Sequence, residues 1–413
     1  MYIFILDNKD SGKKPIKVWL PDISYIDEGA LTQAMNLASL PFIYGWVALM
    51  PDVHEGYGMP IGGVIAAENV IIPNAVGVDI GCGVVFTKTN IPRKSLSEDV
   101  LRNLVGNIMR SVPTGFQHHG IEQSSKTIDK YKESLFSASS SDALFPEIER
   151  AYYQIGTLGG GNHFIEIQED DEGWICLMVH SGSRNLGKKI ADYFNKTAIS
   201  LSSKFFPPVP KHYDLAYLPV DTDEAREYLL WMDFALAFAE ENRQRILEIV
   251  KNEISAKISG VNYTPTYHAH HNYAALEHHY HRDVWVHRKG AIRVRSGEIG
   301  IIPGAMGSYS FIVKGKGNPE SFYSCSHGAG RRMSRAAALK EFSTEQTVLD
   351  LKEKGIVLGM TDKSGVADES RFAYKNIEDV LHYQADLVEP VLRLKTVAVI
   401  KGSEKTGRKK KKK

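Results

Sequence analysis

A short glycine-rich turn places two potential metal ligands close together. The run GVDIGCG puts Asp79 and Cys82 three positions apart. Its glycines let the backbone curl until a carboxylate and a thiol point to one spot. Taken alone, the pair has a plainer explanation, because a free cysteine is usually a small buried hydrophobe and an aspartate in a glycine turn usually accepts backbone amide hydrogen bonds.

Three histidine segments strengthen the metal interpretation. His163 lies in GGGNHF, His180 in VHSGSR and His271 in HHNY, each beside small or amide residues. A set of thiolate, carboxylate and imidazole ligands suits ions of the zinc and manganese class, and a shared thiolate could hold two ions about 3.5–4 Å apart. The spacing does not show that these segments meet in space.

The histidines of residues 268–287 need separate treatment, because seven of them occur in that stretch. Such crowding argues against a specific role for each one. We expect most of them, including His278, His279 and His281, to be surface or helix-face residues.

A second group of segments has residue types suited to a nucleotide. The run GSRNLGKK, which begins at Gly182, matches a phosphate-binding loop in all but its last position. There Lys189 replaces the serine or threonine whose hydroxyl holds Mg²⁺, so a P-loop is not expected. The sequence also lacks the Lys-x-Asp-Gly signature of ligases that use a lysine nucleophile.

The run SCSHGAGRR offers a different nucleophile, His327. Its glycines admit close backbone approach, and Arg331 and Arg332 supply guanidinium groups for phosphate oxygens. An imidazole in this setting could attack an α-phosphate and hold the nucleotide as a phosphoramidate. From local chemistry alone, a polar turn before a helix rich in alanine and arginine explains the run equally well.

The elements that would position these residues are short strands mixed with helices. Apolar residues recur at helical spacing from Glu224 to Lys251, after acidic N-terminal residues, and we expect their methionine and aromatic side chains to lie in the core. Strands and helices do not alternate regularly, which favours an α+β fold. The predicted strands are residues 63–67, 70–72, 84–87, 165–167, 174–179, 284–287 and 291–294.

Composition limits the class of protein. The chain has 413 residues with a formal net charge of +1, but the tail from Arg408 to Lys413 carries six positive charges, which leaves −5 on the rest. Nucleic-acid binding would therefore need a local basic groove rather than a global field. Three cysteines are too few for a disulfide framework, and no stretch is long and apolar enough to span a membrane. We expect a soluble cytoplasmic protein.

Taken together, these segments match the sequence pattern of a known protein family. From about Met50 to Gly402 the sequence resembles the RtcB family of RNA ligases. The resemblance is carried by eight runs in order: MPDVHEGYG at 50–58, GVDIGCG at 77–83, GTLGGGNHFIE at 156–166, VHSGSRNLG at 179–187, HHNYA at 270–274, IIPGAMGSYSFIV at 301–313, ESFYSCSHGAGRRMSR at 320–335 and AVIKG at 398–402.

The resemblance implies a fold, a boundary and a reaction. It implies an RtcB-like α+β domain of mixed sheets flanked by helices over residues 1–402, followed by a basic tail over residues 403–413. The reaction joins an RNA 3′-phosphate, or a 2′,3′-cyclic phosphate after opening, to a 5′-hydroxyl. It consumes GTP, uses two Mn²⁺ ions and acts on RNA as a monomer, with an archease-type protein as a possible activator.

The resemblance also implies residue roles. His327 would be the guanylylated nucleophile, oriented by Asp52. Cys82 would bridge two Mn²⁺ ions, one completed by His180 and His271 and the other by Asp79 and His163. Arg184 and Arg331 are candidates for gripping RNA phosphate. The nucleotide would be held by Asn162, His163, Phe164, Ile165, Glu166, His271, Asn272, Pro303, Gly304, Ala305, Met306, Ser310, Gly328, Ala329, Gly330, Tyr374 and Lys401.

The sequence departs from the family pattern at one position, and it is also compatible with two functions other than RNA ligation. Ala305 stands where relatives carry serine, which puts one hydroxyl contact to the nucleotide in doubt. A binuclear phosphoesterase that needs no GTP would use the same metal ligands. A catalytically silent RNA-binding or metal-holding protein would keep the scaffold without turnover.

Overall fold

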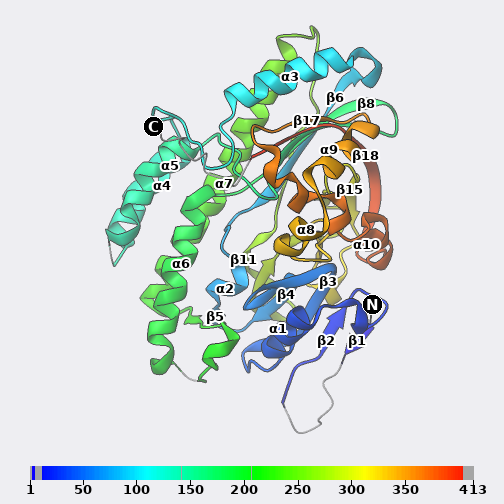
Figure 1. Ribbon diagram of the computed structural model, residues 1–413. Coiled ribbons are helices and arrows are strands. Elements are labelled where there is room, and N and C mark those ends of the chain that lie inside the picture. The colour runs from blue at the N-terminus through cyan, green and yellow to red at the C-terminus, as the bar shows by residue number, and fades with distance from the viewer. Residues whose placement is uncertain (1, 5–11, 141, 206, 403–413) are drawn as a thin grey trace.

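Two large sheets form the centre of the computed structural model, which describes residues 2–4, 12–140, 142–205 and 207–402 (Figure 1). The six-stranded sheet has the order β1 (Tyr2–Phe4), β2 (Ile16–Val18), β3 (Ile43–Tyr57), β4 (Met59–Ala67), β12 (Arg282–Lys289) and β11 (Asn272–His279). All its neighbours are antiparallel except β2 and β3.

The larger sheet carries several of the residues that the sequence singles out, on β7, β8, β15 and β18. Its antiparallel path is β10 (Tyr267–His270), β6 (Gly83–Pro92), β8 (Trp174–Ser181), β7 (Phe164–Asp170), β18 (Val388–Lys401), β15 (Tyr309–Gly315) and β14 (Ile299–Ile302), and β17 (Val357–Gly359) pairs with β18 in parallel. Two short pairs complete the strands: β13 (Ala291–Arg293) with β16 (Ser324–Ser326), and β5 (Val70–Ile71) with β9 (Leu218–Pro219).

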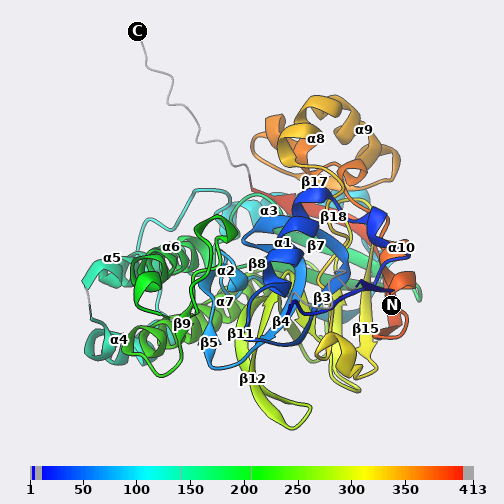
Figure 2. The ribbon, with the colours of Figure 1, turned by 90° about the horizontal axis from the view of Figure 1, so that it is seen from below.

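Helices cover the outer faces of the sheets and form a lobe at one side, where Figure 2 shows α4 to α7 together. The α-helices of the described residues are α1 (Glu28–Ala38), α2 (Pro73–Val76), α3 (Glu98–Ser111), α4 (Lys126–Ala138), α5 (Phe145–Gln154), α6 (Arg184–Leu201), α7 (Asp223–Ser255), α8 (Arg335–Glu341), α9 (Thr344–Glu353) and α10 (Ile377–Tyr383). Two 3₁₀ segments, η7 (Lys363–Glu369) and η8 (Arg371–Ala373), precede α10.

The alternation of side chains along each strand explains how a sheet packs against the other sheet on one face and against helices on the other. In β3, Ala48 and Met50 pack into a core between the two sheets, whereas Val47 and Leu49 pack with α1 on the outer face. Successive strand residues point to opposite faces, so a strand that is buried on both sides reads as a continuous apolar run. The fold is α+β, as predicted.

The long helix α7 begins and ends close to its predicted bounds. The Thr222 side chain accepts a hydrogen bond from the backbone N–H of Ala225, and acidic residues occupy the first turn. Trp231, Met232 and Phe234 are fully or almost fully buried, which confirms that its methionine and aromatic residues belong to the core. No helix of the described ranges combines the length and apolar character that crossing a bilayer requires.

The predicted strands are present with bounds that differ by a few residues, but the histidine-rich stretch differs in kind. His278, His279 and His281 lie in and after β11, on a β-hairpin rather than a helix. His278 and His281 are exposed, as expected. The expectation was wrong for His279, which is 2% exposed and pairs with Glu277, because alternation turns it to the core face. The predicted tail, residues 403–413, lies outside the described residues.

Candidate active site

His327, which is partly buried, pairs with the buried Asp52 at the junction of β16 and β3. The His327 Nδ1 lies 2.7 Å from Asp52 Oδ2, and the His327 backbone N–H donates to the same oxygen over 3.1 Å. Because an ionised carboxylate can only accept, the proton of the neutral ring is on Nδ1. The Nε2 lone pair of His327 is therefore free to act as a nucleophile.

Two glycines make room for this pair. Gly62 has φ +85°, and a Cβ there would lie 2.9 Å from Asp52 Oδ1. Gly330 has φ +73°, and a Cβ there would lie 2.2 Å from the Asp52 carbonyl oxygen. Both conformations favour glycine. Gly330 of the GAG run is thus required for the close approach of β3 to the His327 turn, and Gly62 leaves room for the Asp52 carboxylate.

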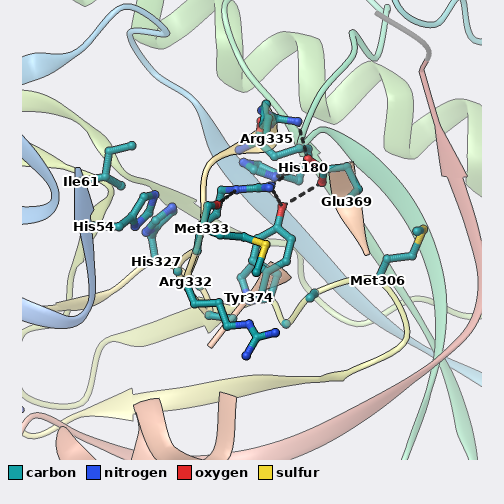
Figure 3. A pocket seen from close by; sticks show the side chains of 18 of the residues that line it. His54, Ile61, His180, Met306, His327, Arg332, Met333, Arg335, Glu369 and Tyr374 are labelled. Carbon is teal, nitrogen blue, oxygen red and sulfur yellow. Dashed lines mark hydrogen bonds and ion pairs between the residues drawn. The ribbon is translucent and has the colours of Figure 1, made fainter. Parts of the chain in front are cut away.

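A second histidine, His54, is anchored by the same residue. Its Nδ1 lies 2.9 Å from the Asp52 carbonyl oxygen, which can only accept, so Nδ1 carries the proton and Nε2 is free. The pKa of His54 is lowered to about 4, chiefly by burial and also by nearby His327 and Lys375, against the raising effect of Asp52. His54 is neutral at neutral pH and lies beside His327 in Figure 3.

The predicted metal ligands come together at neighbouring strand ends of the larger sheet, beside the start of β6, the start of β7, the end of β8 and the end of β10. Ligand atoms of Cys82, His163 and His180 all lie within 4.8 Å of one another. The Cys82 Sγ is 3.4 Å from His163 Nε2 and 3.3 Å from His180 Nε2, and Asp79 Oδ2 is 3.1 Å from His163 Nε2. The ring of His271 is centred 5.2 Å from that of His180 and 4.7 Å from that of His327. His271 therefore lies between the cluster and the nucleophile candidate.

Backbone carbonyls orient the two imidazoles that face the thiol. The Nδ1–H of His163 donates to Leu158, and that of His180 donates to Asn162, over 3.0 Å and 3.1 Å. This is the arrangement in which metal-binding histidines are usually held, with the unprotonated Nε2 turned to the ion. Gly182 lies so close that a Cβ there would meet Asp79 Oδ1 at 2.3 Å.

The donor set fits a borderline-soft divalent ion. Burial and the neighbouring Asp79 raise the pKa of the Cys82 thiol, so the thiolate needs a nearby cation. Burial likewise lowers the pKa of His180 and His271 and keeps both neutral. The Nδ1 of His271 is buried without a hydrogen-bond partner among the described residues. Neutral imidazoles, a carboxylate and a thiol facing one point are what such an ion requires.

A cavity of about 570 Å³ opens in front of His327. Strand β7 contributes Phe164 and Glu166 to its wall, while Ile165 between them packs into the core on the opposite face. Burial raises the pKa of Glu166 to about 7, against hydrogen bonds from Gln168 and Thr396 that lower it. This carboxyl group thus changes its charge near neutral pH.

Most of the predicted nucleotide residues line this cavity. They are Asn162, Phe164, Glu166, Pro303, Gly304, Ala305, Met306, His327, Gly328, Ala329, Gly330, Tyr374 and Lys401. Asp52, His163, Ile165, His271, Asn272 and Ser310 are not among its lining residues. Asn272 donates to the Asp79 carbonyl oxygen and accepts from the Gly290 N–H, and the Ser310 hydroxyl accepts from the Gly304 N–H. Ser310 therefore braces the Gly304 segment, which lines the cavity, and Asn272 braces the turn that carries Asp79.

The two predicted phosphate-binding arginines differ in their surroundings. Arg331 lines the cavity and donates to the Tyr374 hydroxyl over 3.1 Å. Arg184 donates to the Thr157 hydroxyl and the Gly115 carbonyl oxygen, and it is not among the residues that line the cavity. Arg331 is thus better placed than Arg184 to meet a ligand there.

An ionic cluster at the far side of the cavity escaped the sequence analysis. Glu369, at the end of η7, is 2.7 Å from Lys401 Nζ, accepts from the Tyr374 hydroxyl over 2.9 Å and pairs with Arg335 (Figure 3). Although burial disfavours its ionised form, Lys401, Arg335 and Arg331 lower the pKa of Glu369 to about 2. Arg335 is the last residue of the run ESFYSCSHGAGRRMSR, whereas no sequence pattern marks Glu369 as a site residue.

Comparison with known proteins decides the family. A family model described as tRNA-splicing ligase RtcB matches residues 33–402. The chain belongs to the RtcB family. The RNA-splicing ligase RtcB of Escherichia coli is 37% identical over 410 residues, which cover 94% of this chain and 97% of that protein. The tRNA-splicing ligase RtcB of Nanoarchaeum equitans is 32% identical, with 97% and 98% covered, and that of Thermococcus kodakarensis is 31% identical, with 90% and 91% covered.

Membership of the RtcB family confirms the resemblance and the fold expected from it. It also makes the chain a member of a family of RNA ligases. Its cluster of Cys82, His163 and His180 is compatible with dependence on a metal ion.

Proposed function

We propose that this protein is a GTP- and Mn²⁺-dependent ligase that joins RNA 3′-phosphate or 2′,3′-cyclic phosphate ends to 5′-hydroxyl ends through guanylylated His327. The observation that carries the proposal is the 2.7 Å contact of His327 Nδ1 with Asp52. This contact leaves Nε2 unprotonated and turned away from the carboxylate. The ring fronts a cavity large enough for a nucleotide.

The proposed reaction has three transfers. His327 Nε2 attacks the α-phosphorus of GTP, the bond to pyrophosphate breaks, and GMP is held on the ring as a phosphoramidate. An oxygen of the RNA 3′-phosphate then displaces the ring and takes GMP, which activates the RNA end. The 5′-hydroxyl attacks the RNA 3′-phosphorus, and GMP leaves with the electron pair of the broken anhydride bond. A cyclic phosphate is first opened by water.

The metal ligands would be those assembled around Cys82. Cys82 would be shared by two Mn²⁺ ions, with His180 and His271 completing one site and Asp79 and His163 the other. When bound, the ions would neutralise phosphate charge near the reacting atoms. The chain itself supplies neutral imidazoles, fixed by carbonyl hydrogen bonds to His163 and His180.

The nucleotide would occupy the cavity in front of His327. Phe164 and Tyr374 offer aromatic surface, Glu166 and Lys401 offer groups for the base and ribose, and Arg331 offers a guanidinium for phosphate. The remaining predicted contacts would come from Asn162, Pro303, Gly304, Ala305, Met306, Gly328, Ala329 and Gly330, which line the cavity. Ile165, Asn272 and Ser310, which do not line it, would contribute to nucleotide binding through the segments that they hold in place. Arg184 would act on RNA phosphate only with a change of its present hydrogen bonds. We further propose that the protein acts as a cytoplasmic monomer, with an archease-type activator.

Incubation with α-³²P-GTP and Mn²⁺ tests the proposal. We expect an acid-labile, base-stable radiolabelled protein, because a phosphoramidate on histidine has that lability. His327→Asn should lose the label. Absence of label on the unmodified sequence, or a label that survives in His327→Asn, would contradict the mechanism.

The same experiment separates the two rival functions. A binuclear phosphoesterase predicts RNA phosphate hydrolysis without GTP and indifference to His327→Ala. A catalytically silent binding protein predicts retention of RNA or metal with no covalent adduct.

A further inference from the structure

A second cavity, of about 600 Å³, adjoins the one in front of His327. It lies between the end of α9, η8, the start of α10 and the adjoining parts of β15 and β18. Arg332 and Tyr374 line both cavities, and Figure 3 shows the Arg332 side chain extending away from the Glu369 cluster. A ligand chain could therefore pass from one cavity to the other along these two side chains.

The charge of the second cavity is strongly one-sided. Its lining has five cationic side chains, Arg332, Lys354, Arg371, Lys375 and Lys395, and Glu378 is its one carboxylate among the described residues. This contrasts with the net charge of −5 on the chain without its last six residues. The second cavity is thus a local basic groove of the kind that phosphate binding needs in such a protein.

The cations differ in how much of their charge is already used. Arg371 is paired with Asp350 at 2.9 Å, and Lys375 donates to the carbonyl oxygens of Pro51 and Val53. Lys354 donates to one carbonyl oxygen. Lys395 is exposed and has no ion-pair partner in the part of the chain that the structure describes.

Two aromatic rings at the groove are unusually accessible. Tyr309 is 36% exposed and Phe372 is 43% exposed. The Arg393 guanidinium lies 4.7 Å from the Tyr309 ring centre, and that of Arg371 lies 4.1 Å from the Phe372 ring centre. Flat aromatic and guanidinium surfaces beside a basic groove suit unpaired bases, which stack on them, whereas a duplex keeps its bases covered.

We propose that the second cavity binds single-stranded RNA a few nucleotides away from the end that reacts at His327. The proposal rests on the proposed function for the position of the reacting end. Arg332 and Tyr374, which line both cavities, fix the path of the RNA chain between them. Lys354 and Lys395 contact its phosphates, and Tyr309 and Phe372 stack on its bases. A mononucleotide in the first cavity would not reach these groups.

Fluorescence anisotropy with a single-stranded 20-mer RNA bearing a 3′-phosphate tests this proposal. We expect Lys354→Ala/Lys395→Ala to weaken binding about tenfold and to reduce the slope of log K against log salt by about 1.4, since each phosphate contact on a single strand contributes about 0.7. The penalty should disappear for a dinucleotide with the same 3′-phosphate. Lys196→Ala, an exposed lysine of α6 outside both cavities, serves as the matched control.

A radiolabelling assay with GTP distinguishes failure of this proposal from failure of the proposed function. Lys354→Ala/Lys395→Ala should form the His327 adduct at the parent rate, because no RNA takes part in that step. If the parent forms no adduct, the ligase mechanism fails while RNA binding remains measurable. Unchanged affinity of the double variant for the 20-mer, or an equal loss for dinucleotide and 20-mer, would overturn the groove assignment. So would an equal loss with a blunt duplex.

Discussion

Asp52 orients two imidazole rings with two different atoms. Its carboxylate holds Nδ1 of His327, and its carbonyl oxygen holds Nδ1 of His54. Both rings consequently present an unprotonated Nε2 near the same cavity. The carboxylate has a further role in the proposed reaction, because a neutral ring that takes up GMP while keeping its Nδ1 proton becomes positively charged.

Replacing the Asp52 carboxylate by an amide removes its charge but keeps its shape, so the variant shows which of the two matters. Under the proposed function, Asp52→Asn should slow formation of the His327 adduct about 10²–10⁴-fold, because the amide cannot stabilise the charged ring or enforce its tautomer. The rate of label transfer from α-³²P-GTP measures this. Asp99→Asn, at an exposed position in α3, is the control. An Asp52→Asn protein that is labelled at the parent rate would reduce Asp52 to a structural role.

Contacts between residues that are close in the sequence could be predicted from local patterns, whereas contacts between distant residues could not. Asp79 and Cys82 are three positions apart, and a glycine turn brings them together locally. Asp52 and His327 are 275 positions apart, and nothing local to either residue reveals that contact; it came only from the family resemblance. His54 was missed although it stands in the same run as Asp52, because a lone histidine in a strand has no distinctive spacing.

At the scale of elements, alternation and helical periodicity were reliable but incomplete guides. Strand β7 was predicted, and its alternation explains why Phe164 and Glu166 face the cavity while Ile165 faces the core. The order of strands in the sheets was not predictable, because β18 joins β7 to β15 from the far end of the chain. In the hairpin β11–β12, β12 was predicted, whereas β11 was obscured by its histidines.

The helix α7 does more than fill the core. Asn242 donates to the carbonyl oxygens of Thr157 and Gly182, and Arg243, which is fully buried, donates to those of Gly81 and Ser181. These carbonyls belong to the loops that carry the metal-ligand candidates. One turn of a rigid helix therefore fixes three separate glycine-containing loops relative to one another.

Arg243→Met should test this bracing role of α7. Methionine fills the space but leaves buried carbonyl oxygens unpaired, so we expect the free energy of unfolding to fall by about 2–4 kcal/mol. The affinity for Mn²⁺, measured by calorimetry, should fall as well. Arg245→Met is the control, because Arg245 forms a partly exposed pair with Glu241 on the same helix, and its loss should cost about 1 kcal/mol or less. Equal losses in both variants would contradict a special role for Arg243.

At the scale of the whole molecule, the cavity joins segments from both ends of the chain. His54 comes from β3, Phe164 from β7, His327 from the turn after β16, and Lys401 from the last residue of β18. The composition predicted that phosphate binding would be local, and the second cavity places five cationic side chains beside one carboxylate. Where that charge lies could not be predicted, since it depends on how β15, α9 and β18 pack.

The Glu369 cluster makes the stability of the fold depend on pH. Glu369 has a folded pKa of about 2, which is below the value of about 4.3 for an unfolded chain. A depressed pKa means that the unfolded state binds the proton more tightly. The stabilisation is therefore fully present above about pH 4.5 and is lost as the pH falls towards 2.

Glu369→Gln should convert this linkage into a measurable difference. At pH 7 the variant should unfold with a free energy about 2–4 kcal/mol below that of the parent, because Lys401 and Arg335 lose a buried counter-charge. The difference should shrink below pH 4.5, since the unfolded parent then takes up a proton at Glu369 that the folded parent takes up only near pH 2. Urea unfolding at pH 7, 5, 4 and 3 measures it, with the exposed Glu353→Gln as control. A difference that is as large at pH 3 as at pH 7 would mean that Glu369 stabilises the fold through its shape and hydrogen bonds rather than its charge.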